Sequence, residues 1–507
     1  MAATSHPLST LAAIEVLKAG GNAVDAALAA VAVQGVAEPQ MTGIGGDCFA
    51  ILAMAGKAPV AINGSGWSPA GLTPDRLTGE RFIAEASPHA VTVPGAVDAW
   101  VMMAQRYGRI GMERILAPAI AIAEEGFRVT PRVVRDWIRL EGKLGRNDAT
   151  AKMFLPAGRA PRVGDRFANP ALARTLRAIA REGRDAFYEG EVADEIVGLL
   201  KSLGGAHDKS DFAEFRAFET QPVSARFRGR DVLECPPNGQ GLAALIILRI
   251  LDGFPLEELS EADQIHLLAE ATKAAYRQRD LLIADPAHMT VRVEDVLSEA
   301  FIGRLRGKIR MDEASAPAVW DEPVHRDTVC LSVVDGEGNA VSLINSIFSH
   351  FGSGIYAARS GVLLQNRGCG FSLREGHPNR VAPRKRPLHT IIPGMVMQDG
   401  RALMPFGVMG GHYQATGHAH LLTQVFALNK DLQFANETPR SFHFGGTLML
   451  EPSINKCVAA ELSARGHHVA YEDVEPIGGC QAILIDPQRK LLMGGSDHRK
   501  DGLALGY

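Results

Sequence analysis

Hydrophobic residues recur at two spacings along the chain, and the two spacings predict a protein of mixed helices and strands. Apolar positions three or four residues apart predict helices at 8–19, 23–36, 95–107, 112–125, 171–181, 192–203, 242–251 and 261–279. Alternating or short apolar runs bounded by turns predict strands at 223–227 and 230–235, and they dominate after residue 328. The helix at 23–36 is alanine-rich and apolar nearly all round, which indicates a layer packed against a sheet.

The segment HRDTVCLSVVDGEGNAVSLINS, residues 325–346, predicts a buried hairpin whose first residue is a threonine. Apolar residues alternate with small polar ones at 329–333, residues 335–339 form the turn, and 340–344 return. The preceding stretch, 304–327, is polar, contains two prolines and has no clear period, so we expect a mobile linker there. An ordinary strand does not require this arrangement. A nucleophile that must first be released from its own chain does.

A threonine hydroxyl is a poor nucleophile without a base beside it. If the peptide bond before Thr328 is cut, the new α-amino group can take the hydroxyl proton. The reacting carbonyl then needs backbone N–H donors for its developing negative charge, and Gly410-Gly411 in PFGVMGGHY can supply them. The alternative is that Thr328 only begins a strand and that Gly410-Gly411 is only a turn.

Composition narrows the class of protein. The 507 residues imply two domains or one large layered domain, and 46% hydrophobic with 22% charged residues is ordinary for a soluble globular chain. A net charge of -4 and an isoelectric point near 6.5 argue against a nucleic-acid partner. The six cysteines lack CxxC spacing, and Cys48 and Cys330 are predicted to be buried free thiols. With no signal-peptide pattern and no apolar run of membrane-spanning length, we expect a cytoplasmic protein that does not contact membranes.

Three other motifs are set aside on their spacing. The glycines at 43–46 precede a strand instead of following one, so a nucleotide site is not predicted. His412, His418 and His420 lack an acidic or cysteine partner at suitable spacing, so neither a metal nor a cofactor is expected. The triplet at 325–327 lacks the other kinase motifs, which excludes a kinase.

The chain resembles the γ-glutamyltranspeptidases, a family of self-cleaving N-terminal-nucleophile hydrolases, nearly from end to end. The matching segments include EPQMTGIGGDCF, VPGAVDAW, PPNGQGLAALIIL, DTVCLSVVDGEGNAV, RKRPLHTIIP, GVMGGHY and GGSDHRKDGLALGY, in that order. The resemblance implies an α+β fold, a four-layer αββα sandwich whose central sheets are shared by two subunits. It also implies an amide as the small-molecule substrate.

The resemblance places the autocatalytic cut between Asp327 and Thr328. The products would be a large subunit, 1–327, ending in the linker 304–327, and a small subunit, 328–507, which together form an αβ heterodimer.

The catalytic positions of the family carry over as well. Thr328 becomes the nucleophile of both processing and catalysis. Ser346 falls where the family has a threonine that hydrogen-bonds the nucleophile. Gly410 and Gly411 fall on the glycines of the oxyanion hole.

The chain departs from the family where a γ-glutamyl group would be held. It has Ser65 for an arginine, Phe348 for an asparagine, Arg367 for a glutamine or glutamate, Gly370 for an aspartate, and His389-Thr390 for a serine pair. Loss of the aspartate removes the counter-charge for an ammonium, and loss of the arginine removes a bidentate grip on a carboxylate. Arg367 restores one cation elsewhere. Arg367 and His389 together predict an acyl group with a carboxylate or carbonyl and no α-amine, although Arg367 as a structural ion-pair partner and His389 as a packing residue stay open.

The pattern Asn366-Arg367-Gly368 with Phe371 is similar to the amidohydrolase and acylase branch, which includes oxamate amidohydrolases and cephalosporin-acylase-like proteins. Only SLREGHPNRVAPRK follows Phe371, without a glycine-rich lid, which favours an open pocket and hydrolysis over transfer. Two alternatives remain: a γ-glutamyltransferase or glutathione hydrolase with a rearranged grip, and an unprocessed relative that binds small acids. The intact set of Thr328, Ser346, Gly410 and Gly411 favours an enzyme.

Overall fold

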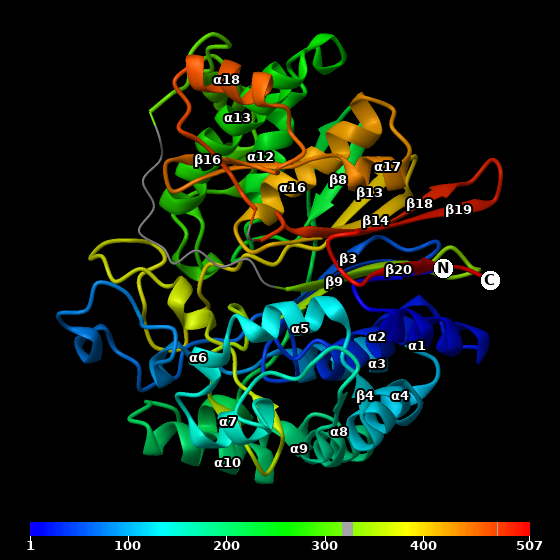
Figure 1. Ribbon diagram of the computed structural model, residues 1–507, viewed down its shortest axis with the longest axis vertical. Helices are drawn as coiled ribbons and strands as arrows, with labels where there is room; N and C mark the ends of the chain where they lie inside the picture. Colours follow the sequence, from blue (N-terminus) through cyan, green and yellow to red (C-terminus); the bar gives the residue numbers. More distant parts are fainter. Residues whose placement is uncertain (317–327, 474) are drawn as a thin grey trace.

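Two β-sheets lie face to face at the centre of the molecule (Figure 1). The computed structural model describes residues 1–316, 328–473 and 475–507. Among these residues the first sheet has the order β20-β1-β9-β10-β2-β3-β6 and the second β19-β18-β14-β13-β8-β7. The first contains β1 (Ala2–Thr4), β2 (Asp47–Ala53), β3 (Val60–Gly64), β6 (Phe218–Thr220), β9 (Val329–Val334), β10 (Ala340–Ser346) and β20 (Leu503–Leu505). The second contains β7 (Val223–Phe227), β8 (Arg230–Glu234), β13 (Gly394–Gln398), β14 (Arg401–Met409), β18 (Gly479–Asp486) and β19 (Leu491–Ser496).

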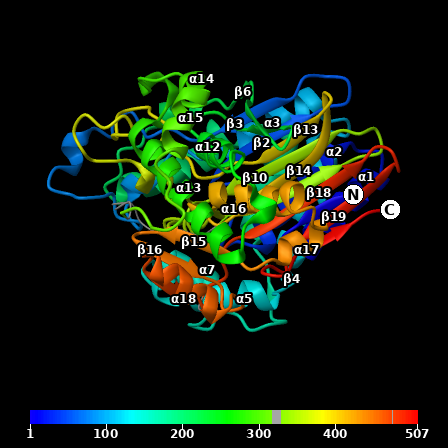
Figure 2. The same cartoon turned by 90° about the horizontal axis from the view of Figure 1, so that it is seen from above.

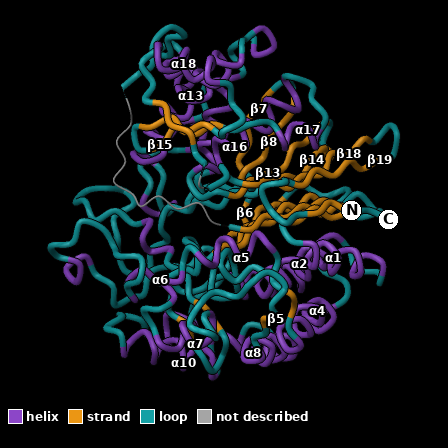
Figure 3. Tube along the Cα trace, in the orientation of Figure 1, coloured by secondary structure: helices purple, strands orange, loops and turns teal. Residues whose placement is uncertain are grey.

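Helices cover the outer face of each sheet, so the layers are helix, sheet, sheet and helix (Figure 3). The first sheet is covered by α1 (Pro7–Lys18), α2 (Ala23–Ala37) and α3 (Ala96–Tyr107), and outside them lie α4 (Gly111–Glu125), α5 (Pro131–Ile138), α8 (Pro170–Glu182) and α10 (Glu191–Ser202). Seen from above, α12 (Gly241–Leu251), α13 (Glu261–Leu282) and α16 (Tyr413–Leu422) lie over the second sheet (Figure 2). This arrangement is the αββα sandwich that the family resemblance implied.

Smaller elements surround these layers. They are β4 (Phe127–Arg128), α6 (Glu141–Leu144), α7 (Asp148–Phe154), β5 (Arg166–Phe167), α9 (Asp185–Tyr188), α11 (Lys209–Ala213), α14 (Val293–Val296), α15 (Glu299–Arg306), β11 (Tyr356–Ala357), β12 (Val362–Leu363), α17 (Leu432–Glu437), β15 (Ser441–Phe444), β16 (Thr447–Leu450), α18 (Lys456–Ala464) and β17 (Val469–Tyr471). The last four build a small unit packed on α13.

The space between the sheets is filled by apolar side chains from both. Phe49 and Ile344 of the first sheet and Met395 and Ile483 of the second are buried in this layer. Cys48 and Cys330 are buried free thiols, as predicted. Burial of one face of each sheet against the other and of the opposite face under helices explains why these strands are apolar on both sides.

The local predictions agree with the structure to within one or two residues at most element ends. The helix predicted at 23–36 is α2, and its N-cap Asn22 accepts the N–H groups of Val24 and Asp25 while Asp25 accepts that of Asn22. This reciprocal capping fixes the start of the helix. The hairpin predicted after Thr328 is β9 and β10, with the second strand running to Ser346.

Residues 304–316, the first part of the predicted mobile linker, are instead held in place. Residues 304–306 belong to α15, and the chain beyond them is tied to α13. Ser315 N–H donates to both carboxylate oxygens of Glu270 at 3.2 Å, and Lys273 donates to Ser315 O at 2.8 Å. These polar residues lack a period because their partners lie on another element. Residues 317–327 are outside the described part of the chain. In the part that is described, no helix combines the length and apolarity of a membrane span.

We predict that Gly46→Ala destabilises the protein and that Gly43→Ala, in the same turn, does not. A Cβ at Gly46 would lie 2.2 Å from Ser346 O, whereas one at Gly43 would meet nothing within 4 Å. The first substitution should lower the free energy of unfolding by about 1–3 kcal/mol through overpacking. The second should change it by less than about 0.5 kcal/mol. Urea unfolding measures both, and equal effects would show that the close approach of β2 to β10 is not a constraint.

At least five buried histidines share a lowered pKa, between about 3 and 4, because burial disfavours the imidazolium. They are His6, His207, His389, His418 and His420. In the unfolded chain their pKa is about 6.5. Between these values the unfolded state binds protons that the folded state does not, so stability is present above pH 6.5 and is lost as the pH falls toward 4.

We therefore predict that the free energy of unfolding falls on acidification below about pH 6.5, by up to about 1.4 kcal/mol per histidine and pH unit. Burial raises the pKa of Glu38 to about 7 and that of Glu234 well above its usual value, which acts in the opposite direction on fewer groups. Denaturant unfolding at pH 7.5, 6.0 and 5.0 measures the slope. A constant or rising stability toward pH 5 would contradict the prediction.

Candidate active site

Thr328 and Ser346 lie side by side where the first sheet meets its loops. Thr328 directly precedes β9, Ser346 ends β10, and the two strands pair with Asn345 opposite Val329. The Thr328 Oγ1 hydroxyl donates to Ser346 Oγ at 3.1 Å, and both residues are fully buried. The ladder therefore places the predicted nucleophile against its predicted partner. Asp327, the other side of the predicted cut, is outside the described residues.

Three hydrogen-bond donors lie within reach of Ser346 Oγ, one more than its two lone pairs can accept. Besides Thr328, the Phe348 N–H lies 3.0 Å from it and Arg367 Nη2 lies 3.4 Å from it. A hydroxyl oxygen has two lone pairs, so the three donors compete. Because of this competition, the Thr328 hydroxyl can give up its bond when another acceptor is offered. Phe348 has φ 77, a strained conformation for a residue with a side chain, which the bond to Ser346 helps to hold.

Arg367 is a buried cation without an acidic partner. Its Nη1 donates to Thr390 Oγ1 at 2.9 Å, and its guanidinium carbon lies 4.3 Å from the centre of the Phe348 ring. Its Nε has no partner among the described residues, and it forms no ion pair with a carboxylate there. Burial lowers its pKa to about 9, and the charge of Asp47 opposes this shift. A buried, uncompensated guanidinium beside the predicted nucleophile is a favourable place for an anionic group.

Gly410 and Gly411 follow β14, the strand of the second sheet that faces β9. The Cys330 Sγ of β9 lies 3.1 Å from Gly407 O, so the start of β9 and the end of β14 are at the same place in the sandwich. Gly410 has φ 123 and Gly411 has φ 56, conformations that favour glycine.

Gln240 connects this glycine turn to the Arg367 side of the site. Its Nε2 donates to Gly411 O at 3.0 Å and to Thr390 O at 2.8 Å. Its Oε1 accepts from Arg279 Nη1 at 2.9 Å, and the same Arg279 nitrogen lies 2.9 Å from His412 Nδ1. The turn therefore rests on a buried network from α13 and cannot rotate freely.

His389 faces Asp47 and not Thr328. Its Nε2 lies 3.0 Å from Asp47 Oδ2, and its Nδ1 accepts the Ile391 N–H at 3.3 Å. Burial and the charge of Arg367 lower its pKa to about 4, so the ring is neutral and Nε2–H donates. Both ring nitrogens are occupied, which favours a positioning role over direct contact with a ligand.

Asp47 is the centre of this second network, and sequence reasoning missed it. Its Oδ1 accepts from Gly66 N–H at 3.0 Å, Gly95 N–H at 3.3 Å and Gln365 Nε2 at 2.9 Å. In the β2–β10 ladder Asp47 lies directly opposite Ser346. The one available signal was an acidic residue at the start of the apolar strand DCFAILA.

Ser65 contacts Asn238 and not Thr328 among its hydrogen bonds to described residues. Asn238 Nδ2 donates to Ser65 Oγ at 3.0 Å and to Pro387 O at 2.7 Å, and Asn63 Nδ2 donates to Asn238 Oδ1 at 3.0 Å. Asn238 and Gln240 both come from PPNGQG, where two amide side chains between a strand and a helix were the signal that sequence reasoning did not use.

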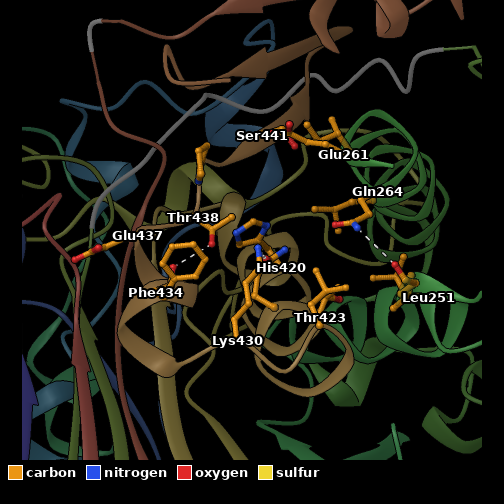
Figure 4. Close-up of a pocket in the computed structure, with 16 residues that line it drawn as sticks. Leu251, Glu261, Gln264, His420, Thr423, Lys430, Phe434, Glu437, Thr438 and Ser441 are labelled. Atoms are coloured by element: carbon orange, nitrogen blue, oxygen red, sulfur yellow. Dashed lines mark hydrogen bonds between the residues drawn. The ribbon is translucent and has the colours of Figure 1, made fainter. Parts of the chain in front are cut away.

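The three histidines His412, His418 and His420 are not brought together. His418 Nδ1 lies 2.6 Å from Glu234 Oε1, and His412 contacts Arg279. His420 lines a cavity of about 650 Å³ between α12, α13, α16 and α17 (Figure 4). None of the predicted site residues lines this cavity.

Comparison with known proteins agrees with this geometry. The family model described as gamma-glutamyltranspeptidase matches residues 9–507. The glutathione hydrolase-like YwrD proenzyme of Bacillus subtilis is 35% identical, with 100% of this chain and 98% of that protein covered. The oxamate amidohydrolase proenzyme of Klebsiella pneumoniae is 35% identical over the same shares. The crystal structure of cephalosporin acylase from Bacillus halodurans aligns with a TM-score of 0.95 at 37% identity, covering 100% of this chain and 96% of that one. The chain therefore belongs to the γ-glutamyltranspeptidase family, as an enzyme of the N-terminal-nucleophile type.

Proposed function

We propose that this protein is a self-processing amidohydrolase that uses Thr328 as an N-terminal nucleophile on a small amide whose acyl group carries a carboxylate or a second carbonyl. The observation that carries the proposal is the contact of Thr328 Oγ1 with Ser346 Oγ at 3.1 Å, beside Arg367, which forms no ion pair with a carboxylate of the described residues. The names of the relatives support it, because they include proenzymes, an amidohydrolase and an acylase.

Processing comes first in the proposed sequence. The Thr328 hydroxyl attacks the carbonyl carbon of Asp327, the C–N bond to Thr328 breaks, and water hydrolyses the resulting ester. The products are chains 1–327 and 328–507. The freed α-amino group of Thr328 then lies next to its own hydroxyl and serves as the base of the catalytic reaction.

In catalysis, the Thr328 hydroxyl gives its proton to the α-amino group and attacks the substrate carbonyl. The negative charge that develops on the carbonyl oxygen is received by the N–H groups of Gly410 and Gly411. The amine leaves with the proton, and water attacks the Thr328 ester in the same way to release the acid. Before the attack, Ser346 positions the hydroxyl by accepting its hydrogen bond.

The substrate preference follows from charge. Arg367 offers a cation whose own partners are the neutral Thr390 and Ser346 hydroxyls, so a carboxylate next to the scissile amide would complete an ion pair. An ammonium at the same place would be repelled. Phe348 supplies an apolar wall. His389 and Ser65 have positioning roles, because His389 donates to Asp47 and Ser65 accepts from Asn238. An oxamate-like or acylase-like amide fits this charge pattern.

A glutathione hydrolase is the second candidate, and the YwrD-like relative is the observation that favours it. The two candidates differ in whether the acyl group carries an α-amine. Turnover of γ-glutamyl-p-nitroanilide faster than that of oxamate would favour glutathione hydrolysis and would overturn the argument from Arg367.

We predict that the purified protein is two chains that separate under denaturing conditions at Asp327/Thr328. Thr328→Ala should stay one uncut, inactive chain, because it has no hydroxyl. Thr328→Ser should be cut more slowly, because it keeps the hydroxyl but loses the methyl group. Thr447→Ala, on β16, is the matched control and should be cut like the natural protein. Intact mass and N-terminal sequencing measure this. A wild-type chain that stays whole on long incubation would favour a binding protein over an enzyme.

We predict that Arg367→Met separates charged from neutral substrates. The variant should lower kcat/KM for oxamate about 10–100-fold, as expected for loss of a charge-assisted contact, and should change kcat/KM for the uncharged oxamide only a few-fold. Arg374→Met, at an exposed position seven residues on, is the control and should leave both values unchanged. An equal loss on both substrates would mean that Arg367 only maintains the fold of the site.

A further inference from the structure

Three buried ligating side chains meet far from Thr328, in the small unit packed on α13. His266 and Glu270 lie one turn apart on α13, and His467 follows α18, a helix that lies beside α13 in Figure 1. One nitrogen from each histidine and one Glu270 oxygen all lie within 4.8 Å of one another, and all three residues are buried. No step of the proposed reaction uses them.

The hydrogen bonds of His266 leave its inner nitrogen free to accept. Its Nε2 lies 2.7 Å from the main-chain oxygen of Arg310, which can only accept, so Nε2 carries the proton. Its Nδ1 is then a lone pair, and it points at His467 Nε2, 2.8 Å away. The two rings are inclined at 72°. A histidine whose outer N–H is held by a carbonyl is the usual arrangement of a metal ligand.

Glu270 retains one carboxylate oxygen with spare capacity. Its Oε1 pairs with Lys273 and accepts from Ser315 N–H, whereas among the described residues its Oε2 accepts only from Ser315 N–H. Lys273 is the neighbouring cation that opposes a metal ion. Its ammonium also donates to Ser315 O at 2.8 Å, so its charge is shared between Glu270 Oε1 and that carbonyl.

A further imidazole lies near the cluster. His443 of β15 is buried, and its Nδ1 has no hydrogen-bond partner among the described residues. The charges of Lys273 and His467 act on its ring, although burial is the larger reason for its low pKa, about 4. The surroundings therefore hold an unpartnered nitrogen in addition to the three atoms that face one another.

We propose that His266, Glu270 and His467 bind a divalent transition-metal ion of the zinc type. Two imidazole nitrogens and a carboxylate oxygen are a donor set that zinc takes, with a fourth position left for water or a further ligand. Nitrogens at about 2.0–2.1 Å from one zinc lie roughly 3.3 Å apart, so the histidines need to separate by only about 0.5 Å. On binding, the His467 proton moves from Nε2 to Nδ1, so that Nε2 offers the metal the lone pair of a neutral imidazole.

The position of the ligands suggests what the ion does. His266 and Glu270 come before the predicted cut, and His467 comes after it. The same side chains tie down residues 310–316 through Arg310 O and Ser315 N–H. Metal binding does not depend on cleavage. Once the chain is cut as proposed, the ion would join the two subunits, with two ligands from the large one and one from the small one.

Metal content and cobalt spectroscopy of the full chain test the proposal. After chelation and dialysis against Zn²⁺, the protein should hold about one zinc per chain, and Co²⁺ in its place should give the visible bands of a tetrahedral nitrogen and oxygen site. His467→Ala and Glu270→Gln should lose the bound ion and the bands. His468→Ala, at the adjacent exposed histidine, is the matched control and should keep both.

Two results would overturn the site. One is a natural protein that takes up neither zinc nor cobalt, which would make the cluster a histidine–histidine hydrogen bond and nothing more. The other is an unchanged cobalt spectrum in Glu270→Gln and His467→Ala. If His467→Ala fails to fold, the cobalt spectra of the natural protein and of Glu270→Gln still show whether the site binds a metal ion. These experiments measure bound metal and not enzyme activity, so their outcome does not depend on whether the chain is cut at Thr328.

Discussion

The pairing of β10 with strands on both of its sides is the constraint on which the site depends. On one side it sets Asn345 opposite Val329 and so brings Thr328 to Ser346, and on the other it sets Ser346 opposite Asp47. A shift of one residue in either ladder would turn every side chain of β10 to the other face. Both faces are buried here, one under α2 and one against the second sheet, so such a shift would be costly.

Buried charge distinguishes the parts of the molecule that hold it together from the part that we propose binds substrate. Arg440 and Arg499 are buried, and both pair with Asp497, while Arg499 also pairs with Glu451. Removing one member of such a group leaves an uncompensated charge and destabilises the fold. Arg367 is equally buried but rests on hydroxyl groups and an aromatic ring. The fold tolerates this cation beside Thr328, where we propose that the acyl group of the substrate binds.

One helix, α13, supports both the Gly410-Gly411 turn and residues 310–316. Near its C-terminal end, α13 carries Arg279, which holds Gln240 under the Gly411 turn. Near its middle it carries His266 and Glu270, which hold residues 310–316. Arg279 lies 9 residues from Glu270 and 13 residues from His266, or roughly 14–20 Å along the helix axis. A rigid rod of this kind keeps the Gly410-Gly411 turn and residues 310–316 in a fixed relation.

The sequence by itself determined whatever depends on neighbours along the chain. The spacing of apolar residues and the cap at Asn22 define α2, and the turn residues at 335–339 define the hairpin that begins after Thr328, because those interactions span a few residues. The order of motifs also identified the family and the candidate nucleophile. Only the tertiary structure paired Asp47 with His389, surrounded Arg367 with hydroxyl groups and no carboxylate partner among the described residues, and joined α13 to distant loops. Those contacts connect residues hundreds of positions apart, and their geometry is set by how the two sheets and their helix layers pack.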